Sequence, residues 1–192
     1  MTALDLIGVY DPLTRLKSMN FVPEFSWRMC ALTKDVFDDR GLRFMPDRVA
    51  ESLGGYDLLV VPGGLGTRSL QHDTAFIEWL RSAGPVKLKT SVCTGALLLG
   101  AAGFLVGRHA TTHPNAFEEL KPYCAAVESR RIVDEGDVVT ARGVSSSLDL
   151  GLHLVERIAG GEARTRIAKQ MDYPYDELNR SKAWLPNSAP SR

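Results

Sequence analysis

The pattern of apolar and polar positions along the chain predicts strands that alternate with helices. Residues 56–61 form a nearly continuous apolar run that ends in a Pro-Gly-Gly turn, as expected of a strand buried on both faces. Residues 86–92 predict the next strand, and helices are predicted at 74–82, after the N-cap Asp73, and at 94–105. This order favours an α/β fold with a mostly parallel sheet and helices on both faces.

Weaker patterns supply the remaining predicted elements. Pro12 lacks an N–H group, so we expect it to interrupt the helix predicted at residues 4–16. The other predicted pieces are extended segments at 26–32 and 42–47, a short strand or loop at 110–113, a helix at 115–120 and a hairpin at 131–141 around Glu135-Gly136. A final helix starts near Ser145–Ser147 and carries on one face Leu148, Leu152, Val155 and Ile158.

Composition and charge narrow the class of protein. The chain has 192 residues, of which 44% are hydrophobic and 24% charged, and this predicts one domain at residues 1–180 followed by a Pro/Ser-rich tail at 181–192. Lys+Arg and Asp+Glu are equal at 23 each, which argues against nucleic acid or an anionic membrane as partner. The longest charge-free stretch, 91–107, contains four glycines and is better explained by a buried turn and helix than by a membrane span.

The N-terminus and the cysteines indicate a cytoplasmic protein. The first residues lack the basic region, apolar run and cleavage site of a secretory signal. The three cysteines, Cys30, Cys93 and Cys124, are widely spaced and odd in number, which fits neither a disulfide framework nor a zinc site. We therefore expect neither a metal nor a cofactor.

Cys93 stands where a predicted strand turns directly into a helix. Such an elbow exposes a nucleophile at the edge of the sheet, and Gly95 leaves room for the tight turn. The helix N-terminus and the Thr94 hydroxyl should lower the thiol pKa and favour the thiolate, while the Thr94 N–H is a potential oxyanion donor. The alternative is a buried structural thiol, which is how we interpret Cys30 and Cys124.

Several segments together resemble the DJ-1/PfpI superfamily, above all its isocyanide hydratase branch and the sensor half of certain AraC-type regulators. They are Leu4-Asp-Leu-Ile-Gly, Val61-Pro-Gly-Gly-Leu-Gly, Ser91-Val-Cys-Thr-Gly-Ala, Ala110-Thr-Thr-His and Gly143-Val-Ser-Ser-Ser-Leu-Asp. The resemblance covers most of the chain. It implies a flavodoxin-like three-layer sandwich, a homodimer and a small-molecule substrate.

The resemblance also implies roles for individual residues. Asp5 matches the acidic residue that hydrogen-bonds the cysteine, and its carboxyl should have a raised pKa that suits a general acid or proton relay. Its alternative role is to complement the helix dipole. Gly63 and Gly64 match the loop whose N–H groups line the pocket as an oxyanion hole, although an ordinary turn also needs such glycines.

Three further residues carry over from the resemblance. Thr94 matches the residue after the nucleophile that touches the substrate, and Val144 matches a backbone position that lines the pocket. His113 matches a histidine near the cysteine, with a purely structural histidine as the alternative; Pro114 stands where the hydratases usually have tryptophan. We interpret His72, His109 and His153 as surface or helix residues.

The family also has an apolar strand before the acidic residue, whereas Asp5 is preceded here by four residues. Loss of an interior strand would leave unpaired backbone groups on both neighbours. We therefore expect the natural start to lie upstream, with the filling of this position by another segment as the alternative.

The leading functional hypothesis is a hydratase-like enzyme that converts an isocyanide to an N-formamide through attack by the Cys93 thiolate, with Asp5 as proton donor. Glyoxalase-like or amidase-like activity on the same constellation is an alternative. A different class of function is a ligand sensor without catalysis, or a thiol redox sensor. The segment after residue 173 is short, so we expect a lone sensor rather than an AraC-type regulator with its helix-turn-helix pair.

Overall fold

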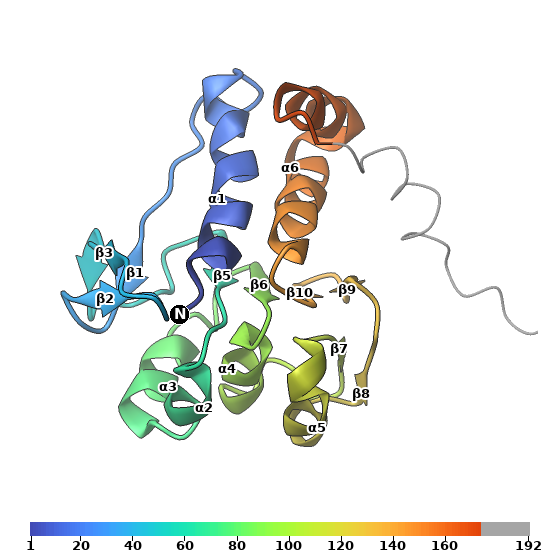
Figure 1. Ribbon diagram of the computed structural model, residues 1–192. Coiled ribbons are helices and arrows are strands. Elements are labelled where there is room, and N and C mark those ends of the chain that lie inside the picture. Colours follow the sequence, from blue (N-terminus) through green and yellow to red (C-terminus); the bar gives the residue numbers. More distant parts are fainter. Residues whose placement is uncertain (174–192) are drawn as a thin grey trace, which may run out of the picture.

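A four-stranded, mostly parallel sheet forms the centre of the molecule in the computed structural model, which describes residues 1–173 (Figure 1). Its strand order is β5-β6-β10-β9, comprising β5 (Leu58–Val61), β6 (Leu88–Val92), β10 (Val138–Ala141) and β9 (Ile132–Asp134). The first three strands are parallel and β9 is antiparallel to β10. The tail predicted at 181–192 and the last residues of the predicted domain lie outside the described residues.

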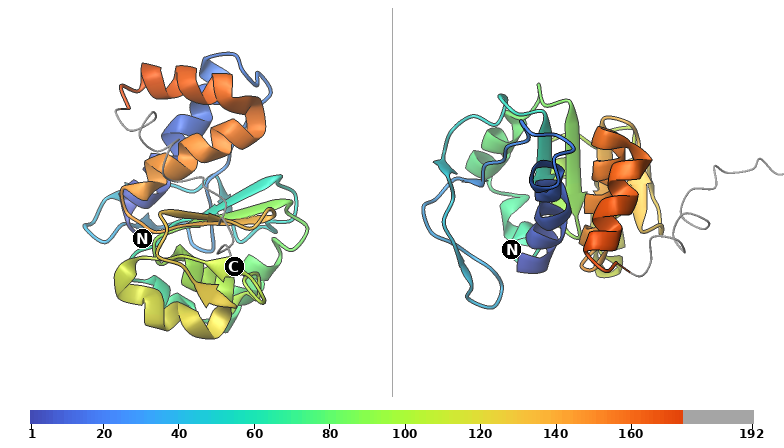
Figure 2. Two further views of the ribbon diagram at one scale, coloured as in Figure 1. Left: turned by 90° about the vertical axis from the view of Figure 1, so that its right-hand side faces the viewer. Right: turned by 90° about the horizontal axis from the view of Figure 1, so that it is seen from above.

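Helices cover both faces of this sheet (Figure 2). One face is covered by α1 (Ala3–Ser18) and α6 (Ser146–Gln170), which lie side by side. On the other face lie α2 (Thr67–Leu70), α3 (Thr74–Arg81), α4 (Gly95–Ala101) and α5 (Phe117–Leu120), with the 3₁₀ turns η1 (Pro114–Ala116) and η2 (Lys121–Tyr123). The fold is therefore mixed α/β with small, mostly parallel sheets, as the alternating pattern predicts.

Three two-stranded sheets lie outside the central one. They are β1 (Cys30–Ala31) with β4 (Arg48–Val49), β2 (Val36–Phe37) with β3 (Arg43–Phe44), and β7 (His109–Ala110) with β8 (Ala126–Val127). Each of the extended segments predicted at 26–32 and 42–47 thus contains a strand of only two residues, β1 and β3. Cys30 of the first segment packs against the core, but Leu42 remains 56% exposed and Met45 79% exposed in the second.

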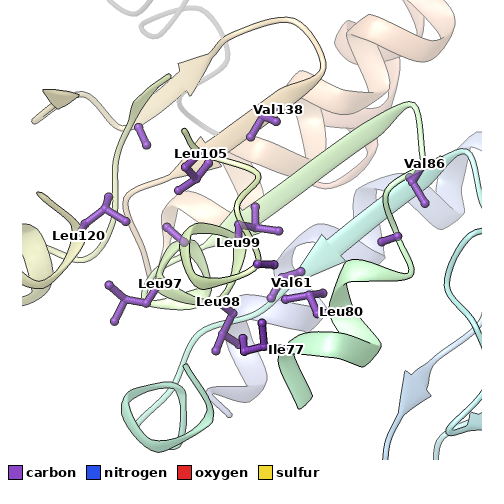
Figure 3. Close-up of a cluster of buried hydrophobic side chains, with 14 of the residues drawn as sticks. Val61, Ile77, Leu80, Val86, Leu97, Leu98, Leu99, Leu105, Leu120 and Val138 are labelled. Atoms are coloured by element: carbon purple, nitrogen blue, oxygen red, sulfur yellow. The ribbon is translucent and has the colours of Figure 1, made fainter. Parts of the chain in front are cut away.

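Two apolar cores flank the sheet. Figure 3 shows the core beneath α4, where Leu97, Leu98 and Leu99 meet Ile77 and Leu80 of α3. The other core lies between the sheet and the α1–α6 pair, and its buried members include Val9, Leu13, Leu16, Val92, Val139, Leu150, Leu152 and Leu154. Cys93 belongs to this second core. Cys93 therefore packs on the α1–α6 side of the sheet.

The predicted interruption at Pro12 is wrong, because α1 continues through it to Ser18. Pro12 packs against Gly151 of α6, where a Cβ atom would lie 2.7 Å from the proline Cγ. One turn earlier, Gly8 faces Ser147 so closely that its own Cβ would lie 2.0 Å from the serine Oγ. Close packing of the two helices outweighs the loss of one backbone hydrogen bond.

Other predicted boundaries hold in part. The hairpin is confirmed, with Glu135 N–H donating to the Val138 carbonyl at 2.9 Å. The helix predicted to reach residue 105 ends at Ala101, because Gly103 adopts a φ of +91° and closes a glycine C-cap. In α6, Gly160 has non-helical angles, and Ile158 is 39% exposed rather than part of the apolar face.

Candidate active site

Cys93 lies at the junction between β6 and α4, directly after the last strand residue. Its φ of +56° is strained for a residue with a side chain, as expected of a nucleophile elbow. Two glycines make the elbow sterically feasible. A Cβ at Gly95 would lie 2.2 Å from the Val61 carbonyl oxygen, and a Cβ at Gly143 would lie 3.1 Å from the Cys93 Sγ. The junction therefore holds the sulfur between two strand ends.

Asp5 lies in the first turn of α1 and is completely buried beside the cysteine. Its Oδ2 accepts a hydrogen bond from the Gly63 N–H at 3.1 Å, and its buried Oδ1 has no hydrogen-bond partner among the described residues. A Cβ at Gly63 would lie within 3 Å of Thr94 N, Cys93 Cβ and Asp5 Oδ2. Glycine at this position therefore lets carboxyl, sulfur and helix N-terminus meet.

Burial shifts the pKa of both partners upward. Desolvation raises the pKa of Asp5 to about 6, although the Gly63 N–H and the Cys93 thiol pull it down. Desolvation, followed by the charge of Asp5, raises the pKa of Cys93 to about 11, against the lowering effect of the Thr94 N–H and hydroxyl. The expected low-pKa thiolate is therefore wrong, since near neutral pH the pair consists of a thiol facing a carboxylate. Cys93 is only 6% exposed, which explains the size of the effect.

The predicted oxyanion hole at Gly63 and Gly64 is already occupied by protein groups. The Gly63 N–H donates to Asp5, and the Gly64 N–H donates to Thr94 Oγ1 at 3.0 Å. The Thr94 hydroxyl also donates to the Gly64 carbonyl at 3.1 Å, so it makes two hydrogen bonds to the backbone of Gly64. The next N–H group, of Leu65, points to the Asp39 carboxylate at 3.2 Å. These amides hold the site together instead of facing an open pocket.

Val144 follows Gly143 on the far side of the sulfur. Its side chain is half-buried against the core that contains Cys93, and its carbonyl accepts from Ser147 Oγ at 2.7 Å. The Gly143 N–H donates to Ser146 Oγ at 2.5 Å. Val144 thus packs against the core that contains Cys93, and its role in lining a substrate pocket stays a prediction.

His113 has a different local role. Its Nδ1 accepts a hydrogen bond from the Asn115 N–H at 3.2 Å and so caps η1. Its neighbour Thr112 contacts the elbow instead, through a hydroxyl that donates to the Cys93 carbonyl at 2.8 Å. Sequence reasoning overlooked Thr112 because a threonine next to a histidine gave no chemical signal of its own.

The other histidines and cysteines considered in the sequence lie away from the Cys93 elbow. His153 lies on α6 as predicted but is buried, with Nε2 2.7 Å from Asp134 Oδ2, and the exposed His109 lies 2.9 Å from Glu128. Cys30 and Cys124 are half-buried free thiols. Within residues 1–173, no cluster of three His, Cys, Asp or Glu side chains could hold a metal ion. The same residues contain no helix with the length and apolarity needed to cross a membrane.

Comparison with known proteins identifies the relatives of this site. The isonitrile hydratase of Pseudomonas putida is 33% identical over 194 residues, which span 98% of this chain and 80% of the relative. A THiJ/PfpI family protein from Pseudomonas syringae superposes with a TM-score of 0.82 at 27% identity, covering 100% of this chain and 75% of that structure. An AraC family transcriptional regulator from Pseudomonas putida shares the fold, with a TM-score of 0.74 at 21% identity, over 88% of this chain and 93% of the other.

The family match covers both strand ends that form the site. The DJ-1/PfpI family matches residues 7–157, which include the Pro-Gly-Gly loop, the cysteine elbow and the first half of α6. Together with the elbow geometry and the buried carboxyl, this match shows that the chain belongs to the DJ-1/PfpI family.

Proposed function

We propose that this protein is a cysteine hydro-lyase that hydrates a small isocyanide to an N-substituted formamide. Cys93 is the nucleophile, Asp5 carries the proton, and Thr94 holds the loop that closes over both. In this proposal the enzyme is a cytoplasmic homodimer with a flavodoxin-like three-layer fold and needs neither metal nor cofactor. The substrate is the small electrophile, and neither nucleic acid nor membrane is a partner.

The single observation that carries the proposal is the buried thiol–carboxyl pair. Because the pKa of Asp5 is about 6 and that of Cys93 about 11, the carboxylate is the base and the thiol the acid near neutral pH. Attack on a substrate makes the sulfur far more acidic, and Asp5 is in place to accept its proton. A carboxyl with a pKa near 6 can then return that proton to a carbon centre.

The reaction balances with water as its only co-reactant. The sulfur of Cys93 forms a bond to the terminal isocyanide carbon, and the thiol proton passes through Asp5 to the same carbon, which gives a thioimidate. Water then adds to this carbon, and one of its protons moves to the substrate nitrogen. The carbon–sulfur bond breaks as the remaining hydroxyl proton passes through Asp5 to the departing sulfur. The products are the N-formamide and the regenerated thiol.

The occupied loop amides support this chemistry over the acyl-transfer alternatives. Amidase and glyoxalase reactions develop negative charge on a carbonyl oxygen, which needs free N–H donors. Here the N–H groups of Gly63 and Gly64 are already bound by Asp5 and Thr94. An isocyanide has no oxygen, and the charge that develops on its carbon is removed by proton transfer from Asp5. The name of the Pseudomonas putida relative agrees with this substrate class.

A second candidate function is a ligand sensor without catalysis. The observation in its favour is that Cys93 is a buried, protonated thiol, which is poorly suited to spontaneous reaction. In this reading the electrophile binds beside the sulfur but is released unchanged.

Turnover of a defined isocyanide separates the two functions. The wild-type protein is incubated with cyclohexyl isocyanide, and N-cyclohexylformamide is quantified by chromatography; methylglyoxal is the comparison substrate. We expect formamide from the wild type and from Cys124→Ser, a matched control at another partly buried thiol, and none from Cys93→Ser. Saturable binding of the isocyanide without product, in wild type and Cys93→Ser alike, would establish the sensor instead.

A further inference from the structure

The backbone at Cys93 is strained and must be held by its surroundings. A φ of +56° brings the Cβ of a non-glycine residue too close to its own backbone, and such a conformation persists only where neighbouring groups enforce it. If the elbow relaxed to a negative φ, the side chain would turn away from Asp5. The groups that fix the peptide units on either side of Cys93 therefore determine where the sulfur points.

Two hydrogen bonds fix these peptide units. On the N-terminal side, the Cys93 N–H donates to the Ala141 carbonyl at 2.9 Å, which continues the pairing of β6 with β10. On the C-terminal side, the Cys93 carbonyl accepts from Thr112 Oγ1 at 2.8 Å. The only helical contact to this carbonyl in the described residues is the Ala96 N–H at 3.4 Å, which is long. Thr112 is thus the main support of the second peptide unit.

Thr112 is itself firmly anchored. It is completely buried, and the N–H of its neighbour Thr111 donates to Thr140 Oγ1 at 2.9 Å. Thr140 lies on β10 in register with Ser91 of β6. The segment that carries Thr112 is therefore attached to β10, the strand that also accepts the Cys93 N–H, so that its hydroxyl has a fixed position.

We infer that Thr112 is a positioning residue, whose hydroxyl holds the Cys93 elbow so that the sulfur faces Asp5. This inference deepens the proposed function, on which its turnover measurement rests. It also moves the functional role within the Thr-Thr-His motif from His113 to Thr112. The group of this motif that serves the site is the second threonine, while His113 caps η1.

The central test compares Thr112→Val, which keeps the size of the side chain but removes the hydroxyl, with Thr112→Ser, which restores it. We expect kcat for cyclohexyl isocyanide to fall about tenfold in Thr112→Val, in line with the loss of one buried hydrogen bond, with KM unchanged. Thr112→Ser should recover kcat to within about twofold of wild type. If Thr112→Val does not accumulate as folded protein, Thr112→Ala takes its place with the same expectation.

A matched control comes from β6 itself. Thr90 is completely buried, and its hydroxyl donates to the Leu59 carbonyl at 2.9 Å, but that carbonyl belongs to an unstrained strand. Thr90→Val should lower the melting temperature while leaving kcat within about twofold of wild type. An equal loss of kcat in Thr90→Val would show a general packing effect and overturn the inference.

Alkylation of Cys93 by iodoacetamide gives a readout that does not depend on the substrate. The rate is followed by mass spectrometry of the peptide that contains Cys93, so that Cys30 and Cys124 do not interfere. In the wild type we expect the rate to rise as Asp5 loses its proton near pH 6, because the carboxylate then accepts the thiol proton, and to rise again as the thiol ionises near pH 11. In Thr112→Val the sulfur no longer faces Asp5, so the rise in alkylation rate on ionisation of Asp5 should disappear. The rise on ionisation of the thiol itself should remain.

The two outcomes separate the inference from the proposed function. If the wild type does not turn over the isocyanide but Thr112→Val loses the first rise in alkylation, the proposed function fails and the positioning role stands. If Thr112→Val keeps the wild-type profile, the positioning role is refuted, whatever the substrate.

Discussion

Asp5 and Asp134 are two carboxyls on the same side of the sheet, and their surroundings move their pKa values in opposite directions. Asp5 is completely buried, whereas the Asp134 side chain, at the end of β9, is 23% exposed. Burial raises the pKa of Asp5 to about 6, and its strongest compensating contact is a single backbone N–H from Gly63. Burial also acts on Asp134, but His153, the Gly136 N–H and the charge of Arg157 outweigh it and lower the pKa. The two sites share a residue type but differ both in burial and in their partners.

This difference shows how a proton-transfer group can be told from a structural one. A carboxylate that contacts a histidine ring at 2.7 Å and forms an ion pair with an arginine at 3.1 Å has its charged form stabilised in place. A carboxylate that faces a thiol has a partner that can give up its proton but adds no positive charge. Asp5 therefore titrates near physiological pH, where it can both accept and return a proton.

The largest expected effect follows from removing the proton carrier. Asp5→Asn keeps the shape of the side chain but cannot accept the thiol proton, so we expect isocyanide turnover to fall about 10²- to 10⁴-fold, the usual contribution of general acid–base catalysis. Steady-state kinetics measure this loss. Asp134→Asn serves as the matched control and should retain most of its activity per folded molecule. Similar losses in both variants would mean that Asp5 has no special role.

A smaller effect concerns the pH dependence of stability. Because the pKa of Asp5 rises from 3.8 in the unfolded chain to about 6 in the folded one, its contribution to stability is full below pH 3.8 and is lost as the pH rises through 6. The free energy of unfolding of the wild type, relative to Asp5→Asn, should thus fall by about 2 kcal/mol between about pH 4.5 and about pH 7.5. Urea denaturation of both proteins at the two pH values measures this change.

Asp134 should show the opposite sign. Its pKa is lowered on folding, so its stabilisation is present above pH 3.8 and is lost as the pH falls below that value. For Asp5, the raised pKa would be contradicted if the difference in unfolding free energy between wild type and Asp5→Asn stayed constant across the pH range given above.

The smallest effect is expected at His113. Because this side chain caps η1 through the Asn115 N–H, His113→Ala should cost about 0.5–1 kcal/mol of unfolding free energy, as loss of a helix cap does. Turnover should remain within about twofold of wild type, since the contact of His113 is with η1 rather than with the sulfur. Thermal unfolding and kinetics on the same preparation test both statements. A loss of activity as large as that of Asp5→Asn would restore a catalytic role for this histidine.

Local signals predicted the elements with clear patterns, and the misses have a common physical cause. The apolar run at 56–61, the cysteine turn and the hairpin at 131–141 each carry their signal within a few residues. The continuous path of α1 through Pro12 depends on Gly151, which lies far away in the sequence. The short strands β2 and β3 pair outside the main core, so their apolar residues stay exposed or half-buried and give no reliable period.

The sequence by itself determined the α/β class, the place of Cys93 at a strand–helix junction and the resemblance of the chain to the DJ-1/PfpI family. Each of these features depends on residues that are close together in the sequence. Only the tertiary structure decided the charge state of the thiol, the occupation of the Gly63 and Gly64 amides and the support of the elbow by Thr112. Each of these depends on burial and on hydrogen bonds between residues 19 to 58 positions apart, which no local pattern encodes.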